Sequence, residues 1–257
     1  MVDPDTQREA VVAAVEAVAE RMAEERRYLT DLDSAIGDAD HGGNVTRGFE
    51  AAAEQVAEAA EADDDATPAD LVKRVGRALI SEVGGASGPL YGGSIMSASA
   101  ELDGGITAET TVAFAEAYLD KLQERGKAEL GSKTMVDAVT PAVHTYKKSI
   151  EQDDLPPLSA LAKAVDAAER GVRFTTPLRA KKGRASYLGW RSVGHQDPGA
   201  TSTLFVLEEL LSVADDYLEG DVERDATSPT VPDADPEEAA DDEGAGGADG
   251  PDAGGDD

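Results

Sequence analysis

The sequence predicts an all-α fold of eight antiparallel helices that run up and down over residues 1–220. Three observations support this class. Ala, Glu and Leu, which favour helices, are abundant, and clusters of β-branched residues, which favour strands, are few. In addition, clusters of Gly, Pro and Asp divide this part of the chain into eight stretches of helix-forming composition.

The predicted helices follow one another between these breaks. They lie near residues 5–27, 44–62, 68–83, 93–102, 108–125, 133–149, 157–173 and 199–217. The first carries an apolar stripe formed by Val11, Val15, Val18 and Met22. The fifth carries another, formed by Ala113, Phe114, Ala117, Tyr118 and Leu122. The last is crowded with apolar residues and begins at Asp197 and Pro198, which are typical of an N-cap and a first helical position.

The connections between these helices are of two kinds. Those after the second, fourth and sixth helices are plain, whereas the others contain unusual clusters of Asp, Gly, Lys and Arg. The unusual connections cover residues 27–43, 84–92, 126–132 and 174–198. Because alternate connections of an up-and-down bundle lie at the same end, all four are expected to meet there and to form a single site.

A second region, residues 221–257, differs in composition from the rest. It has 14 acidic residues, one basic residue (Arg224) and almost no large apolar side chain. Such a segment cannot bury enough surface to offset its ordering entropy, so we expect a disordered acidic tail after a folded domain at 1–220.

The charge of the chain limits its partners. The formal net charge is −30, which disfavours binding to nucleic acid or to anionic membranes and is typical of a protein from a salt-loving organism. No apolar run approaches the ~20 residues of a membrane span. The chain has no cysteine, and its N-terminus lacks the apolar core of a secretory signal. A cytoplasmic location is therefore expected.

The segment around Asp33, Asp38 and Asp40 is the strongest chemical signal. Asp38 and Asp40 lie two positions apart in an extended loop, so both can face one ion, and Asp33 can close the site from the preceding helix. Carboxylate oxygens are ligands that Mg²⁺ prefers, and glycines beside them allow close approach of phosphate oxygens. The alternative is a solvated acidic loop in an acidic protein, which composition alone makes equally probable.

Two further segments could bind an anion. Residues 83–93 contain five glycines and Ser87 just before a predicted helix, although a tight helix–helix turn would need the same small residues. Residues 181–191 are basic in an otherwise acidic chain and suit a phosphate-bearing ligand or an acidic partner. Neither His41 nor His195 is assigned as a covalent phosphate carrier. The Walker A motif, the dinucleotide glycine motif and the nucleophile elbow are all absent.

Four stretches resemble the nucleotide-binding L subunit of dihydroxyacetone kinase. They are LDSAIGDADHGGN, GGASGPLYGG, GSKTMVDAVTPA and GRASYLGWRSVGHQDPGATST, which occur in the family's order and span most of residues 1–217. The resemblance implies an eight-helix antiparallel barrel that binds ADP or ATP with Mg²⁺ at one end. One departure is Ala39, where many members have Gly. His41 favours the dihydroxyacetone branch, because related fatty-acid kinase domains usually have Thr there.

The resemblance also implies the roles of individual residues. Asp33, Asp38 and Asp40 would coordinate two Mg²⁺ ions. The remaining nucleotide-binding residues would be His41, Asn44, Ala86, Ser87, Gly126, Thr134, Met135, Arg184, Asp197, Pro198 and Gly199. No catalytic residue is expected on this chain, because in the family a separate K subunit binds dihydroxyacetone.

Two versions of the kinase exist in the family. In one, ADP stays bound and is rephosphorylated in place by an M subunit of the phosphoenolpyruvate phosphotransferase system; a chain that carries L alone favours this version. In the other, ATP exchanges as an ordinary substrate. The further alternatives are the nucleotide domain of a kinase for another acceptor, such as a small ketose or a fatty acid, and a regulatory ADP-bound module.

Overall fold

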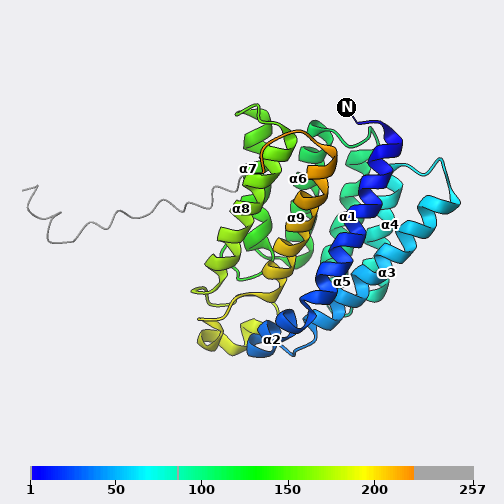
Figure 1. The fold of residues 1–257 in the computed structure, drawn as a ribbon. Coiled ribbons are helices and arrows are strands. Elements are labelled where there is room, and N and C mark those ends of the chain that lie inside the picture. The colour runs from blue at the N-terminus through cyan, green and yellow to red at the C-terminus, as the bar shows by residue number, and fades with distance from the viewer. Residues whose placement is uncertain (1, 86, 223–257) are drawn as a thin grey trace, which may run out of the picture. The chain divides into compact units, whose positions relative to one another are not determined.

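The computed structural model describes residues 2–85 and 87–222, which fold into helices and connecting loops (Figure 1). The α-helices are α1 (Pro4–Glu24), α2 (Arg26–Ile36), α3 (His41–Ala62), α4 (Pro68–Glu82), α5 (Ser87–Ala98), α6 (Ala108–Gly126), α7 (Val136–Glu151), α8 (Pro157–Thr175) and α9 (Pro198–Tyr217). Two 3-10 helices are η1 (Ser99–Leu102) and η2 (Arg184–Ser192). No strand occurs in this part of the chain, so the predicted all-α class is confirmed.

The long helices pack in chain order. In the series α1, α3, α4, α5, α6, α7, α8 and α9, each helix packs against the next, and α9 also packs against α1. Most of their bounds agree with the predicted ones to within a few residues. This neighbour order is that of an up-and-down arrangement; the regular barrel geometry stays a prediction.

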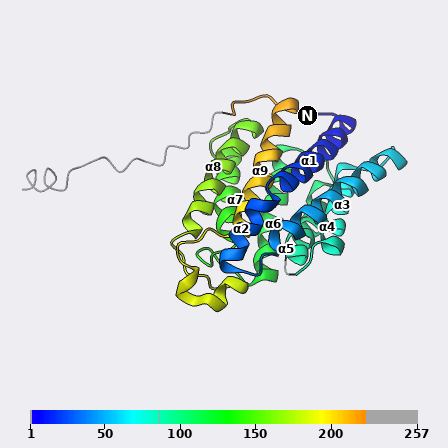
Figure 2. The same cartoon turned by 60° about the horizontal axis from the view of Figure 1, so that its bottom comes forward.

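The short elements α2 and η2 lie together at one end of the helices (Figures 1 and 2). A small apolar cluster joins them, in which Ile36, Ala180 and Ala185 are buried and Leu188 packs against them. The segment after α8 is thereby attached to the segment between α1 and α3. The predicted convergence of these two connections at one end is confirmed.

The expectation that residues 27–43 form a loop was wrong for most of that range, because residues 26–36 form α2. Leu29 and Ile36 are both buried and lie seven residues apart, which is helical spacing. The Asp residues in this stretch suggested a break, but the helix ends only at Gly37. Burial of two apolar side chains outweighs the weak local preference of Asp for turns.

The expectation of a loop over residues 84–92 was also wrong in part, because α5 begins at Ser87 rather than near 93. Two of its glycines serve helix packing. A Cβ atom on Gly92 would lie 2.4 Å from the carbonyl oxygen of Gly76 in α4, and one on Gly88 would lie 2.4 Å from that of Val83. The alternative reading of this glycine-rich stretch, small residues at a tight helix contact, is therefore confirmed at these positions.

Two smaller differences concern the other unusual connections. Helix α7 starts at Val136, not near 133, and residues 184–192 form η2 inside the expected loop 174–198. In η2 the non-helical conformation of Gly189 (φ 57°) interrupts the helix. The short helical turns on either side of it are too brief to show a helical period in the sequence.

The core has two large parts. One is formed mainly by α1, α3, α4 and α7, with contributions from α2, α5 and α6, and contains the fully buried Met22, Leu29 and Leu79; the other is formed by α7, α8 and α9. Each fully buried side chain of this size contributes about 2 kcal/mol. None of the helices in residues 2–85 and 87–222 is long and apolar enough to cross a membrane. The predicted acidic tail lies, from residue 223 on, outside the described residues.

Candidate functional site

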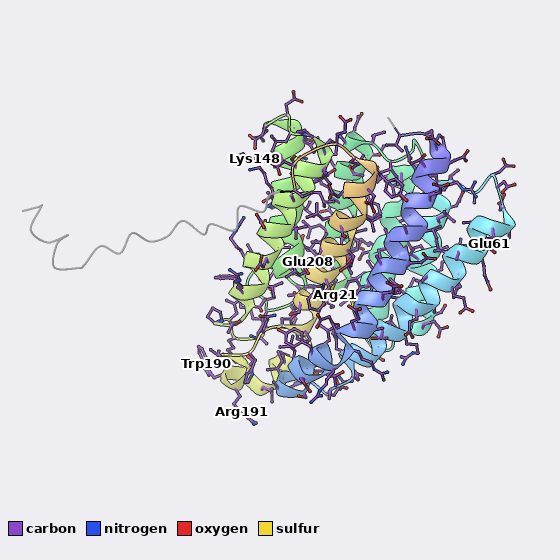
Figure 3. All side chains as sticks on the ribbon, in the orientation of Figure 1. Arg21, Glu61, Lys148, Trp190, Arg191 and Glu208 are labelled. Carbon is purple, nitrogen blue, oxygen red and sulfur yellow. The ribbon has the colours of Figure 1, made fainter. Side chains whose placement is uncertain are left out.

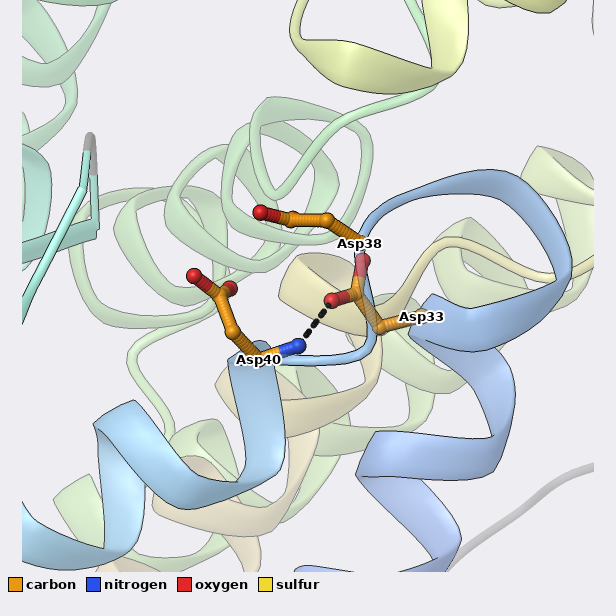
Figure 4. A group of neighbouring side chains, drawn as sticks. All are labelled: Asp33, Asp38 and Asp40. Carbon is orange, nitrogen blue, oxygen red and sulfur yellow. Dashed lines mark hydrogen bonds between the residues drawn. The ribbon is translucent and has the colours of Figure 1, made fainter.

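The three aspartates predicted as metal ligands lie together between α2 and α3 (Figure 4). Asp33 is in the last turn of α2, whereas Asp38 and Asp40 belong to the turn that precedes α3. One carboxylate oxygen from each of the three lies within 4.8 Å of the others. Oxygen ligands of one octahedral Mg²⁺ are separated by roughly 3–4 Å, so this donor set fits such an ion after small adjustments.

Asp33 also organises the backbone of the turn. It is buried, and its Oδ2 accepts hydrogen bonds from the backbone N–H groups of Asp40 (2.9 Å, dashed in Figure 4) and His41 (3.1 Å). A Cβ atom on Gly37 would lie only 2.0 Å from Asp33 Oδ1, so the turn requires glycine at that position. Ala39 adopts φ 63°, a left-handed conformation in which the methyl group is unfavourable.

The basic side chain of Arg184, at the start of η2 between α8 and α9, approaches this cluster. Arg184 Nε lies 2.9 Å from Asp38 Oδ1, and the Arg184 side chain is 63% exposed whereas that of Asp38 is 35% exposed. Carboxylates held this close repel one another, and a cation offsets that repulsion. Arg184, which was predicted to line a nucleotide pocket, is therefore brought directly to the aspartate cluster.

His41 is buried at the first position of α3 and connects that helix to α9. Its Nε2 is 2.8 Å from Ser202 Oγ, and the Tyr91 hydroxyl of α5 is 2.9 Å from the same oxygen. Burial lowers the pKa of His41, although Asp33 and Asp40 oppose this shift. Burial raises the pKa of Tyr91 to about 12. This hydrogen-bonded network joins the N-terminal halves of α3, α5 and α9. The sequence analysis did not identify Ser202 or Tyr91 as part of it, because each lies among small residues that show no helical period.

Asn44 and the loop before α5 are neighbours. Asn44 Oδ1 accepts a hydrogen bond from Arg47 (2.9 Å), and a Cβ atom on Gly84 would lie 3.1 Å from that oxygen. Ser87 is half-buried at the first position of α5. Ala86, also predicted at the phosphates, lies outside the described residues.

A second group of predicted residues surrounds the start of α7. Asp137 accepts hydrogen bonds from the backbone N–H groups of Gly131 and Thr134, which shapes the loop before the helix. Met135 is buried, and a Cβ atom on Gly199 would lie 3.8 Å from its Cβ. Loop 131–135 and the start of α9 are therefore in contact. Gly126, at the end of α6, lies against Leu90 of α5.

Asp197 is the N-cap of α9 and is buried. Its Oδ1 accepts a hydrogen bond from the Ala200 N–H (2.7 Å), and Pro198 occupies the first helical position. The capping predicted for this pair is confirmed. Burial raises the pKa of Asp197 to about 7, against the effects of the Ala200 hydrogen bond and the Lys133 charge. The Asp33 carboxylate contributes to the same shift, so the two groups of predicted residues are close enough to interact electrostatically.

The basic stretch 181–191, together with Arg179 just before it, forms the outer part of this end. Tyr187 and Trp190 are 90% and 75% exposed, and Arg179 Cζ lies 5.3 Å from the centre of the Trp190 ring. Figure 3 shows Trp190 and Arg191 at the end of the molecule that carries α2. Because Arg184 turns to Asp38, this stretch supplies positive charge beside the acidic cluster.

The chain matches a family model over most of its described length. The model is that of the DAK2 domain, and it matches residues 35–212. The match includes Asp38, Asp40, the basic stretch and the start of α9, and leaves out Asp33 and the acidic tail.

Similar proteins are known in bacteria. The chain is 43% identical over 192 residues to the "PEP-dependent dihydroxyacetone kinase, ADP-binding subunit DhaL" of Escherichia coli, which covers 74% of this chain and 89% of that subunit. It is also 36% identical over 195 residues to a D-erythrulose kinase of Mycolicibacterium smegmatis. The matched part covers 75% of this chain and 33% of that kinase.

A solved structure has a similar fold. The dihydroxyacetone kinase of C. freundii, crystallised in complex with AMP-PNP and Mg²⁺, superimposes with a TM-score of 0.56 at 27% sequence identity. The match covers 79% of this chain and 33% of that kinase, so the chain spans about a third of the solved enzyme.

Proposed function

The chain belongs to the DAK2 domain family, and on this premise we propose that it is the ADP-binding subunit of a phosphoenolpyruvate-dependent dihydroxyacetone kinase. Its relatives are named kinase subunits and kinases, so the chain is a phosphotransferase subunit. In this proposal it holds ADP or ATP with Mg²⁺ and passes the phosphoryl group to dihydroxyacetone on a separate K subunit. An M subunit of the phosphotransferase system rephosphorylates the ADP. A cytoplasmic location stays a prediction.

One observation carries the proposal. Three carboxylates from α2 and the following turn lie within 4.8 Å of one another, at the end where the basic stretch and the starts of α3 and α9 also lie. A solvated acidic loop would not need a buried Asp33 that fixes two backbone N–H groups, nor a glycine that fits only against its carboxylate. The same end provides negative ligands for a cation and positive groups for an anion.

We assign the metal to Asp33, Asp38 and Asp40, as the resemblance implies. Bound Mg²⁺ would neutralise phosphate charge and orient the group that is transferred. Asp33 is already fixed by two hydrogen bonds, so little ordering is left for its carboxylate when an ion binds. Asp38 and Asp40 are exposed and can adjust to the ion.

We place the phosphates of the nucleotide at the N-terminal ends of α3 and α5. Both helices begin at this end of the molecule, and the N–H groups of a helix's first turn, together with its dipole, favour an anion. The residues concerned are His41, Asn44, Ala86 and Ser87. Arg184, which can turn from Asp38 to a phosphate oxygen, adds a bidentate donor.

The rest of the nucleotide is assigned to the loops before α7 and α9. Gly126, Thr134, Met135, Asp197, Pro198 and Gly199 are the residues concerned. Support comes from the closeness of three of these residues, because a Cβ atom on Gly199 would lie 3.3 Å from Asp197 Oδ1 and 3.8 Å from Met135 Cβ. Because the pKa of Asp197 is about 7, both its carboxylate and its protonated form are accessible near neutral pH, and the protonated form can donate a hydrogen bond to the nucleotide.

The proposal is tested by denaturing the purified chain and identifying the released nucleotide. Stoichiometric ADP that survives dialysis supports the retained coenzyme. A chain that purifies empty and binds ATP reversibly supports an ATP-exchanging subunit instead. A chain that binds neither nucleotide in the presence of Mg²⁺ contradicts both.

A second candidate is the nucleotide domain of a kinase for another small ketose, which the similarity to D-erythrulose kinase favours. Because the acceptor site is expected on another chain, phosphorylation assays of dihydroxyacetone and erythrulose with the purified partner subunit decide between the two. A regulatory ADP-bound module would show no turnover with either acceptor.

A further inference from the structure

The connection from α8 to α9 extends away from the helices, and its two ends lie close together. It contains η2, the exposed Tyr187 and Trp190, and Arg184. Its two ends meet, because the Gly194 N–H donates a hydrogen bond to the carbonyl oxygen of Thr176 (2.9 Å). We call residues 176–194 the closed loop.

Lys133 lies at the neck of this closed loop. Its side chain is only 1% exposed, which is rare for lysine. Its Nζ donates hydrogen bonds to the carbonyl oxygens of Thr175 (2.6 Å) and His195, the residues that immediately flank the closed loop. One ammonium group therefore joins the last residue of α8 to the residue that follows the loop.

The same lysine belongs to the loop before α7. Its neighbour Ser132 accepts a hydrogen bond through its carbonyl oxygen from the Lys181 N–H (3.0 Å), so the two loops are also joined by their backbones. Lys133 has φ 62°, a left-handed conformation that lysine rarely adopts. Such a conformation persists where surrounding contacts impose it, and here those contacts are the two carbonyl groups.

Charge explains why a lysine is tolerated at this depth. Burial lowers the pKa of Lys133, but the carboxylates of Asp197 and Asp137 both oppose that shift. Asp197 is itself connected to the neck, because its backbone N–H donates a hydrogen bond to Thr175 Oγ1 (3.0 Å). An apolar residue at position 133 would leave the buried carbonyl group of Thr175, the partly buried carbonyl group of His195 and the buried carboxyl group of Asp197 without this partner.

We propose that Lys133 is a positioning residue that fixes the neck of the closed loop, and so sets the placement of Arg184 and Asp197 for nucleotide binding. The proposal rests on the proposed function only in its last step, that these residues face a nucleotide. The placement of the loop follows from contacts within this chain alone.

The test compares K133M with K163M, in which an exposed lysine of α8 is replaced by the same residue. Two properties are measured on nucleotide-free protein at matched salt: the affinity for ADP with Mg²⁺, and the fluorescence and acrylamide quenching of Trp190. The chain has a single tryptophan, and it lies in the closed loop, so its signal reports the loop directly. Far-UV circular dichroism and a cooperative melt establish that each variant is folded.

We expect K133M to fold, to bind ADP at least tenfold more weakly than wild type, and to show altered quenching of Trp190, while K163M matches wild type in all three. As a second variant, K133A should regain affinity and the wild-type Trp190 signal when propylammonium is added, since this cation replaces the missing ammonium group. A lysine with a general packing role would not be rescued in this way.

K133M that binds ADP within twofold of wild type with an unchanged Trp190 signal overturns the proposal. If K133M does not fold, K133A decides, and the absence of rescue by propylammonium overturns it. If wild type itself binds no nucleotide, the proposed function fails, whereas the Trp190 comparison still tests the placement of the loop.

Discussion

Arg184 extends from η2 to Asp38 across the turn before α3, with its Nε 2.9 Å from Asp38 Oδ1. The pair joins two segments that are almost 150 positions apart in the chain, and it brings a permanent positive charge to the acidic cluster. Because water reaches both side chains, and most of Arg184, the pair contributes little to stability and serves mainly to place charge.

We therefore expect Arg184→Gln to separate stability from binding. An exposed ion pair contributes about 0–1 kcal/mol, so the free energy of unfolding should change by no more than that. The affinity for ADP with Mg²⁺ should fall about tenfold, as expected for loss of a charged hydrogen bond worth ~1.5 kcal/mol. Urea unfolding and nucleotide titration measure the two effects. Lys163→Gln, which removes an exposed charge of α8 outside the proposed site, is the control and should change neither.

The assignment of Asp38 as a metal ligand predicts that Asp38→Ala abolishes tight retention of ADP with Mg²⁺. The cluster would lose one of three oxygen donors, and the remaining two would hold the ion far more weakly. The measurement is the ratio of nucleotide to protein after dialysis. Asp31→Ala removes an exposed carboxylate of α2 that belongs to no cluster and should retain ADP. Stoichiometric ADP in the Asp38 variant would show that the ion is held elsewhere.

The left-handed conformation of Ala39 predicts that Ala39→Gly stabilises the chain. The left-handed region costs a non-glycine residue ~1–2 kcal/mol, and glycine loses part of that gain to its greater freedom in the unfolded chain. A net increase of about 0.5–1 kcal/mol in the free energy of unfolding is expected from urea denaturation. Gly37→Ala should have the opposite effect, because its methyl group would overlap Asp33 Oδ1. Equal stability of Ala39→Gly and wild type would mean that the turn relaxes in solution.

The raised pKa of Asp197 predicts a pH dependence of stability. Its pKa is about 7 in the folded chain against an ordinary value of 3.8, so between these two pH values the folded state holds a proton that the unfolded state has released. Stability should therefore fall as pH rises from about 4 to about 7, by up to roughly 4 kcal/mol from this group. In Asp197→Asn this contribution is absent. Urea unfolding across that range, with chelator present, should give a variant that gains on wild type as pH rises; parallel curves would contradict the assignment.

Much of the fold was predictable from the sequence because its signals are local. Apolar residues at helical spacing in α1 and α6, and the Asp197–Pro198 start of α9, each determine one helix without help from its neighbours. Helix α2 was missed because its Asp residues suggest a turn. The helix is favoured by the burial of Leu29 and Ile36, which depends on residues far away in the sequence. The start of α5 was predicted too late because glycine serves both turns and close helix contacts, and the Gly76–Gly92 approach is visible only in three dimensions.

The candidate site was predictable to the same extent. The spacing of Asp33, Asp38 and Asp40 indicated a cluster, and the structure brings their carboxylates together. The supporting groups were not recognisable, because they act through the tertiary structure. Lys133 gave no signal beyond a helix start, yet it is buried between two carbonyl groups, and Ser202 stands in a run of small polar residues although it joins His41 to Tyr91.

The segment 176–194 can be replaced as a unit, because its two ends lie next to each other. Since Thr176 and Gly194 are already within hydrogen-bonding distance, the segment between them can be exchanged for that of a relative without changing the distance that α8 and α9 must bridge. The outer surface of this loop, including its exposed aromatic residues, can therefore vary while Ala180, Ala185 and Arg184 keep their contacts with the segment that holds the aspartates. Loop-swapped chimeras would measure what the exposed aromatic residues of this loop contribute while the helices stay the same.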